Sequence, residues 1–180
     1  MASQDSVLVY SPHHPGFLHR TLGHLSALIA IKPDSGVQPV QILWSGIVFH
    51  WFPPTENYKI AVKRPALSNA NQPDAVVFEV RVVSPSLVEK QILLVECKQP
   101  SLDTQTNWDN EGQVLDDVQS TLNLGNGVYS AIAIVTKVRF YFCDGQTVQG
   151  LHQNILDLHE EDGQRATEYW LDHIKQKCLV

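Results

Sequence analysis

The chain has few of the features that mark secreted, disulfide-rich or membrane proteins. Its 180 residues include three cysteines, Cys97, Cys143 and Cys178, which lie far apart and form no CxxC motif. No apolar run approaches the roughly 20 residues needed to cross a bilayer, and the N-terminus shows no basic segment followed by an apolar one. These absences argue against a disulfide scaffold, a cysteine-built zinc site and a membrane protein. We expect an intracellular protein, cytoplasmic or nuclear, with reduced thiols and no membrane partner.

The chain also lacks an excess of basic residues. Its net charge is −6 at pH 7, whereas dedicated high-affinity nucleic-acid binders usually carry a basic surface. Residues 1–98 contain eight Lys/Arg and seven Asp/Glu, while residues 99–180 contain five Lys/Arg and twelve Asp/Glu, a net charge of −7. Any contact with an anion is therefore expected in the first half of the chain or at its edge.

The composition is that of one ordinary globular domain. Hydrophobic residues make up 43% of the chain and charged residues 18%, which is enough apolar material for a core and too much for disorder. No internal repeat, low-complexity run or long linker divides the sequence. We therefore predict a single domain over residues 1–180.

The hydrophobic period changes along the chain. Leu18, Leu22, Leu25 and Ile29 recur at helical spacing and would form one apolar stripe. The patterns predict helices over residues 17–31, 40–52, 111–122, about 148–160 and 164–177. They predict strands over residues 58–63, 74–83, 88–98, 129–135 and 138–143, and a polar loop over residues 99–110. Helices on both sides of these strands predict an α/β fold with a mixed central sheet flanked by helices.

Three charged residues interrupt otherwise apolar strands: Asp74, Glu96 and Lys98. A charge within a strand needs a reason, because burying one without a partner is costly. In a hairpin centred on Pro85, paired residue numbers add up to 170, so that Asp74 lies opposite Glu96. Lys98 lies two residues further on and points to the same face. The other residues on this face of the hairpin are apolar, namely Val76, Phe78, Ile92 and Leu94.

Directly opposed strand residues have Cβ atoms about 4.5–5.5 Å apart. Two carboxylates that close repel each other, and a cation between them would relieve the repulsion. A hard divalent ion such as Mg²⁺ or Mn²⁺ binds one or two carboxylates and keeps water molecules for a substrate and a nucleophile. Lys98 could then orient or deprotonate an attacking water, or stabilise charge on a phosphate. The three residues therefore indicate metal-assisted hydrolysis of a phosphodiester, with a structural cluster of salt bridges as the alternative.

The same residues form a known motif. Pro73-Asp74, followed on the next predicted strand by Glu96-Cys97-Lys98, resembles the PD-(D/E)xK signature of the restriction-endonuclease-like nuclease superfamily. The predicted order of elements also resembles the αβββαβ core of that superfamily. The resemblance covers about residues 17–145, and the helices predicted within residues 148–177 lie outside it. It implies a divalent-metal-dependent nuclease, a hydrolase that acts on nucleic acid, DNA rather than RNA.

The resemblance implies a role for each matching residue. Asp74 and Glu96 would be ligands of Mg²⁺ or Mn²⁺, and the backbone carbonyl of Cys97 would be a further ligand. Lys98 would be the catalytic lysine. Members of the recombination and repair branches often carry a glutamine on the helix after this strand, and Gln113 matches that position. Gln113 would help to hold the substrate or a water molecule, with a solvated or capping role as the alternative.

The chain also departs from the superfamily pattern. Many members carry a glutamate on the first core helix, whereas residues 17–31 and 40–52 contain no acidic residue. Members with the helix glutamine often carry a tyrosine four residues later, where this chain has Asp117. Acidic side chains near the expected site are unfavourable for a polyanion, and they are Asp109, Glu111, Asp116 and Asp117. Two alternatives therefore stay open: a degenerate member that binds a protein or a small ligand, and an enzyme that uses the same pocket on a small molecule.

Other residue groups allow both a structural and a functional interpretation. Cys97 points away from the face of Glu96, which favours a core thiol over a nucleophile. His19 and His24 are five residues apart and diverge by about 140° on a helix, which disfavours a histidine metal site. The helix at 164–177 could pack on the sheet or support a homodimer.

Aromatic and basic residues of the first half could contact nucleic acid. Core packing is favoured over base stacking for the aromatic residues Trp44, Phe49, Trp51 and Phe52. A phosphate-binding row and an ordinary solvated face are equally compatible with the basic residues Lys59, Lys63, Arg64 and Arg81.

Overall fold

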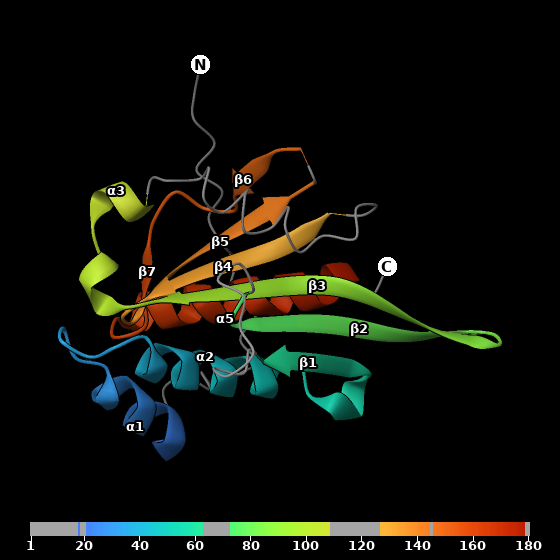
Figure 1. Ribbon diagram of the computed structural model, residues 1–180, viewed down its shortest axis with the longest axis horizontal. Helices are drawn as coiled ribbons and strands as arrows, with labels where there is room; N and C mark the ends of the chain where they lie inside the picture. The colour runs from blue at the N-terminus through green and yellow to red at the C-terminus, as the bar shows by residue number, and fades with distance from the viewer. Residues whose placement is uncertain (1–17, 19–20, 63–72, 109–126, 145, 179–180) are drawn as a thin grey trace.

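Helices from both ends of the chain cover a sheet built from its middle (Figure 1). The computed structural model describes residues 18, 21–62, 73–108, 127–144 and 146–178. Its helices are α1 (Leu22–Ala30), α2 (Gln38–Trp51), α3 (Gln105–Trp108) and α5 (Glu161–Cys178), with 3-10 helices at Pro54–Glu56 and Pro100–Leu102. Its strands are β1 (Tyr58–Val62), β2 (Ala75–Val83), β3 (Ser86–Lys98), β4 (Val128–Ile134), β5 (Lys137–Cys143), β6 (Val148–Gly150) and β7 (Leu156–Asp157). None of these helices combines the length and apolar character needed to cross a membrane.

The strands form one mixed sheet. Its order is β1-β2-β3-β4-β5-β6, and β7 pairs with β5. β3 and β4 are parallel, whereas the other neighbouring strands are antiparallel. Parallel neighbours need a long connection, and residues 99–127 lie between these two strands. The α/β class and the mixed sheet are confirmed, while the helix predicted over 111–122 lies outside the described residues.

α2 and α5 pack on one face of the sheet, α1 packs on α2, and the three helices form the helix-side core with the sheet. α2 buries the apolar stripe that its sequence predicts, which consists of Val40, Leu43, Trp44, Ile47, Val48 and Trp51. Trp44 meets Phe140 of β5 edge-on, with 6.2 Å between the ring centroids. α5 adds Leu171 and Ile174, and Figure 1 shows it behind β3 and β4. Packing of α5 on the sheet and core packing of Trp44, Trp51 and Phe52 are therefore confirmed. Core packing of Phe49 is wrong, because its side chain is 45% exposed on the outer side of α2.

The opposite face of the sheet carries a second, smaller core. Its buried members are Val76, Leu94, Trp108, Val128, Ile132, Ile134, Tyr141 and Cys143. Trp108 comes from α3, which lies within the stretch predicted as a polar loop. A single aromatic residue in a polar stretch gives no periodic signal, so the sequence pattern did not reveal this apolar cover.

The apolar stripe predicted for the first helix is wrong. Leu22 and Ile29 of α1 are 84% and 74% exposed, and the buried residues of this helix are His24 and Leu28. Leu18 is buried, but it precedes the helix, and its backbone N–H donates a hydrogen bond to α5. The face of α1 that meets the rest of the fold is therefore set by this tertiary contact and by packing on α2, and a row of large apolar side chains stays exposed.

The helix predicted over residues 148–160 is also wrong. β6 and β7 lie there and pair with the outer edge of β5. Between them, Nε2 of His152 accepts a hydrogen bond from the Phe140 N–H at 3.3 Å, so the imidazole fills a gap in the ladder. Burial lowers the pKa of His152, which agrees with a neutral ring that can accept this bond. Edge pairing with β5 outweighs the helical pattern, and α5 begins only at Glu161.

Candidate functional site

The β2–β3 hairpin brings Asp74 next to Cys97 in the centre of the predicted motif. The first residues of β2 pair with β3 in the predicted register, in which paired residue numbers add up to 170. Asp74 lies directly before β2, and its Oδ2 accepts a hydrogen bond from the Cys97 N–H at 2.7 Å, across a separation of 23 residues. The two parts of the sequence motif therefore meet at one end of the sheet.

The turn of this hairpin differs from the prediction. The turn consists of two residues, 84–85, and so has its centre between them. The predicted turn had its centre on Pro85 itself. Near the turn the paired residue numbers add up to 169, and between Phe78 and Val77 the sum changes to 170. The change occurs because Ile92 is the extra residue of a β-bulge in β3. The bulge restores the predicted register at the base of the hairpin. It also turns Ile92 into the helix-side core, so its predicted place on the face of Leu94 is wrong.

The Asp74 carboxylate is held from two sides and is 7% exposed. Its Oδ1 accepts a hydrogen bond from Nε2 of Gln41 on α2 at 2.7 Å, while its Oδ2 accepts the bond from Cys97 of β3. These two donors satisfy a buried charge. Because an ionised carboxylate has about four lone-pair sites, each oxygen keeps a position for a further ligand. Sequence reasoning missed Gln41, and the available signal was a polar residue at the border of the apolar stripe of α2.

Glu96 and Lys98 lie on the face opposite the helix-side core. They alternate along β3 with Cys97, whose side chain is buried in the helix-side core as predicted. Glu96 pairs with Ile132 of β4, and Lys98 pairs with Ile134 at the end of the same strand. The predicted common face of Glu96 and Lys98 is therefore confirmed, and both side chains are half-buried. The Asp74 carboxylate, which was predicted on that face, instead accepts a hydrogen bond from α2, which packs on the opposite face.

The Cys97 side chain lies in an environment that disfavours its thiolate form. Burial, and then the charges of Asp74 and Glu96, raise the pKa of the Cys97 thiol well above its ordinary value. The thiol is therefore protonated at neutral pH and is a poor nucleophile. This supports the core-thiol interpretation and leaves the backbone of Cys97 as the part that faces the site.

Two basic residues of β5 lie at the same end of the sheet as the motif. Ile132 pairs with Arg139 and Ile134 pairs with Lys137, so each isoleucine lies between a residue of the motif and a basic residue. Nη1 of Arg139 donates a hydrogen bond to the backbone oxygen of Trp108 at 3.2 Å. Sequence reasoning did not single out these two cations, because their proximity to the motif follows from the parallel pairing of β3 and β4.

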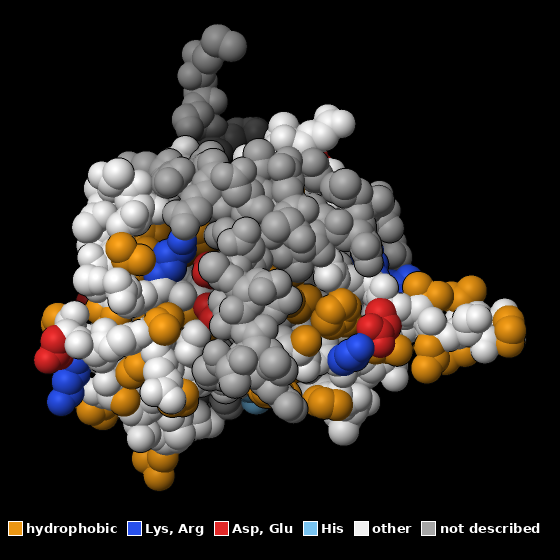
Figure 2. Space-filling view, viewed as in Figure 1, with side chains coloured by type: hydrophobic (Ala, Val, Ile, Leu, Met, Phe, Trp, Pro, Cys, Tyr) orange, Lys and Arg blue, Asp and Glu red, His pale blue; other side chains and the backbone are white. Residues whose placement is uncertain are grey.

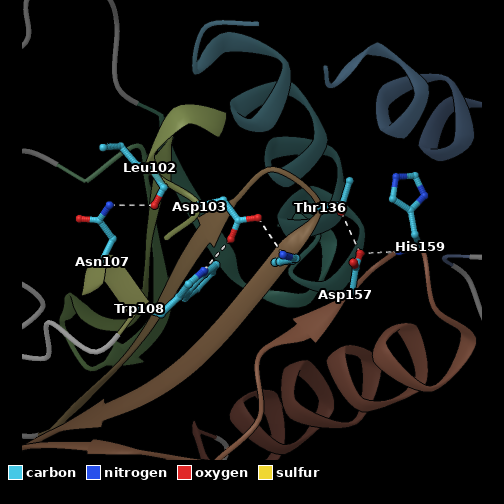
Figure 3. Close-up of polar contacts among 8 residues, drawn as sticks. Leu102, Asp103, Asn107, Trp108, Thr136, Asp157 and His159 are labelled. Atoms are coloured by element: carbon cyan, nitrogen blue, oxygen red, sulfur yellow. Dashed lines mark hydrogen bonds and ion pairs between the residues drawn. The ribbon is translucent and has the colours of Figure 1, made fainter. Parts of the chain in front are cut away.

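The segment after β3 is fastened to β5 through Asp103 (Figure 3). Asp103 accepts hydrogen bonds from Nε1 of Trp108 at 2.8 Å and from Nζ of Lys137 at 2.7 Å. Asn107 donates to the backbone oxygen of Leu102 at 2.9 Å and so closes the turn between them. Burial acts to raise the pKa of Asp103, but the bonds from Lys137 and Trp108 outweigh it and the pKa lies below its ordinary value. This arrangement fixes the chain directly after the motif.

The β4–β5 turn lies beside this anchor. Val135 has a φ of 60°, in the left-handed region that β-branched residues rarely adopt. Its neighbour Thr136 donates from Oγ1 to Oδ1 of Asp157 at 2.8 Å, and the His159 N–H donates to the same oxygen at 3.0 Å (Figure 3). A strained turn persists only where its surroundings hold it, and these two bonds supply part of that restraint.

Several predicted residues lie outside the described part of the chain, and they are His19, Lys63, Arg64, Asp109, Glu111, Gln113, Asp116 and Asp117. Within the described residues, no group of three or more His, Cys, Asp or Glu side chains is arranged to hold a metal ion.

Lys59 forms an ion pair with Glu89, and Arg81 forms one with Glu79. Both cations therefore already have a carboxylate partner, an exposed one for Lys59 and, for Arg81, a glutamate whose side chain is only 8% exposed.

Comparison of the chain with models of known families, with curated proteins and with solved structures finds no match. The sequence motif and the geometry of its residues are therefore the basis for assigning a function.

Proposed function

We propose that this protein is a divalent-metal-dependent nuclease with a restriction-endonuclease-like fold, which hydrolyses phosphodiester bonds of nucleic acid, DNA rather than RNA. The observation that carries the proposal is the hydrogen bond between Asp74 and the Cys97 N–H. It joins the two halves of the PD-(D/E)xK-like motif at the end of β3. Glu96 and Lys98 share a face of β3 and add two further charged groups at the same end, which supports the proposal.

The order of the elements supports the proposed fold. α2 is followed by β1, β2 and β3, and β4 then lies parallel to β3. This agrees, for the described residues, with the αβββαβ order that the resemblance implies. In open α/β sheets, ligands bind beyond the carboxyl ends of parallel strands, and the motif lies at the carboxyl end of β3.

The donor set fits a hard divalent cation. Asp74 and Glu96 offer carboxylate oxygens and Cys97 offers its backbone carbonyl, which are the ligand types that Mg²⁺ and Mn²⁺ prefer. Asp74 keeps acceptor positions beside its two hydrogen bonds. With only two carboxylates from the described residues, much of the coordination shell would be left to water and substrate. A cation held there supplies Lewis-acid polarisation of the scissile phosphate.

The protein's own side chains would orient the attacking water molecule and stabilise charge on the phosphate. Lys98 lies on the face of Glu96, where its ammonium group can hold an attacking water molecule or balance charge on the phosphate. Asp74 is held by its two donors, so its carboxylate is oriented before a ligand arrives. Gln113 stays a candidate for holding substrate or water.

A cleavage assay tests the proposal. Supercoiled plasmid and single-stranded oligonucleotides are incubated with the wild type in Mg²⁺ or Mn²⁺, beside Glu96→Gln and Lys98→Ala. The matched controls are Glu89→Gln and Lys90→Ala, because they change the same residue types near the other end of β3. We expect each site variant to lose about 100-fold or more of the activity, and each control to keep it. Equal activity in all five proteins, or no cleavage by folded wild type, would overturn the proposal.

A second candidate is a binding module that keeps the fold and has lost cleavage. Two observations favour it. Both Asp74 oxygens already accept hydrogen bonds within the protein, and large apolar side chains of α1 are exposed. Thermal denaturation separates the candidates: the nuclease predicts that Mg²⁺ raises the melting temperature of the wild type and not that of Glu96→Gln, whereas the binding module predicts no metal effect in either.

A further inference from the structure

α2 contributes one polar side chain to the base of the β2–β3 hairpin. The Nε2 group of Gln41 donates to Oδ1 of Asp74 at 2.7 Å. The neighbouring residue Val40 and the residue one turn later, Trp44, are both fully buried in the helix-side core, so this end of α2 is fixed on the sheet. The Gln41 amide therefore reaches Asp74 from a rigid element.

The two bonds of Asp74 restrict its rotation. One carboxylate oxygen is held from α2 by Gln41 and the other from β3 by the Cys97 N–H, so turning the carboxylate about its Cβ–Cγ bond breaks both. An amide donor can do this without cancelling the charge, whereas a Lys or Arg at position 41 would neutralise the carboxylate. The arrangement therefore keeps the Asp74 carboxylate in one orientation.

We infer that Gln41 is a positioning residue, which sets the Asp74 carboxylate for binding a divalent cation. The inference rests on the proposed function, since it assigns a task to Gln41 within that same site. It gives this chain a neutral hydrogen-bond donor on α2 beside the Asp74 carboxylate. A glutamate at position 41 cannot donate to Asp74 when ionised and would repel it unless a cation lies between them.

The inference makes opposite predictions for two substitutions. Gln41→Met removes the donor at similar length, so a higher Mg²⁺ concentration should be needed for half-maximal thermal stabilisation, by about tenfold. Gln41→Glu adds a carboxylate, so saturating Mg²⁺ should raise its melting temperature by about 3 °C more than that of the wild type. Gln38→Glu is the matched control, because it places the same charge on an exposed position in the first turn of α2.

Thermal denaturation over a series of Mg²⁺ concentrations is the experiment, with circular dichroism to show that each variant is folded. A purely structural role for Gln41 lowers the melting temperature of Gln41→Met equally with and without Mg²⁺, and that result would overturn the inference. So would a Gln41→Glu protein that responds to Mg²⁺ like Gln38→Glu. If Gln41→Met does not fold, the Gln41→Glu comparison decides alone. A wild type that neither responds to Mg²⁺ nor cleaves nucleic acid would instead refute the proposed function itself.

Discussion

Charged side chains are usually exposed and apolar side chains usually buried, and the two ends of the β2–β3 hairpin depart from this rule in opposite ways. At the base, the charged Asp74 side chain is 7% exposed. At the tip, Val82 and Leu87 are 78% and 71% exposed, and Figure 2 shows apolar side chains gathered where the tip extends beyond the rest of the molecule. A buried carboxylate needs partners, whereas an exposed apolar side chain costs little. The base is therefore specified by its hydrogen bonds, and the tip is not.

The largest expected effect follows from removing the buried charge at the base. Asp74→Ala leaves the Gln41 amide and the Cys97 N–H without their acceptor. We expect the free energy of unfolding to fall by about 2–4 kcal/mol, since each unsatisfied buried donor costs about 1–3 kcal/mol. Urea denaturation measures this, with Glu89→Ala at the exposed end of β3 as the control. A loss below about 1 kcal/mol for Asp74→Ala would show that the base is no better specified than the tip.

The base of the hairpin was predictable because it obeys local rules. The period of two along β3 places Glu96 and Lys98 on one face and Cys97 on the other, and the structure keeps that alternation. The register near Asp74 was also predicted, although it arises from a shorter turn combined with a bulge at Ile92. Two departures from the regular ladder cancel at the base, so the pairing there was right although the pairing toward the tip was not.

The other features of the hairpin and of the site depend on contacts between segments that are far apart in the sequence. The bulge turns Ile92 into a core formed with helices far away in sequence, and no local pattern encodes that choice. Gln41 meets Asp74 only because α2 packs on the sheet, and Lys137 reaches Asp103 only because β4 lies parallel to β3. Hydrogen bonds between distant segments thus supply the parts of the site that periodicity could not show.

The next prediction extends the base of the hairpin to the segment that follows it. The folded-state pKa of Asp103 is below its ordinary value, so this residue adds stability above pH 4, near the unfolded pKa of about 3.9. That contribution is lost as the pH falls through the lower folded-state pKa. We expect the wild type to lose about 0.5–1 kcal/mol more than Asp103→Asn between pH 5 and pH 2, a small value because the pair with Lys137 is partly exposed. Urea titrations at a series of pH values measure the difference, and parallel curves for the two proteins would contradict it.

Apolar side chains at the tip should be replaceable at little cost. Val82→Thr and Leu87→Thr keep a β-branched or strand-compatible residue and should change the free energy of unfolding by less than about 0.5 kcal/mol. Val77→Thr, in the fully buried part of β2, should cost about 1–3 kcal/mol and is the matched control. A tip substitution that costs as much as the control would mean that the tip is covered in solution. A melting temperature that depends on protein concentration would then identify a second copy of the chain as the cover.

A similarly small effect is expected for the ion pair that flanks the tip. Nζ of Lys59 lies 2.9 Å and 2.8 Å from the two carboxylate oxygens of Glu89, and it also lies 5.3 Å from the ring centroid of Phe78. Both charged side chains are about half exposed, so a double-mutant cycle with Lys59→Met and Glu89→Gln should give a coupling of about 0.2–1 kcal/mol. High salt should remove most of it, because exposed charges are screened. A coupling that survives 1 M salt would place this pair in a shielded environment like that of Asp74, and the contrast between the two ends of the hairpin would then hold for the apolar side chains alone.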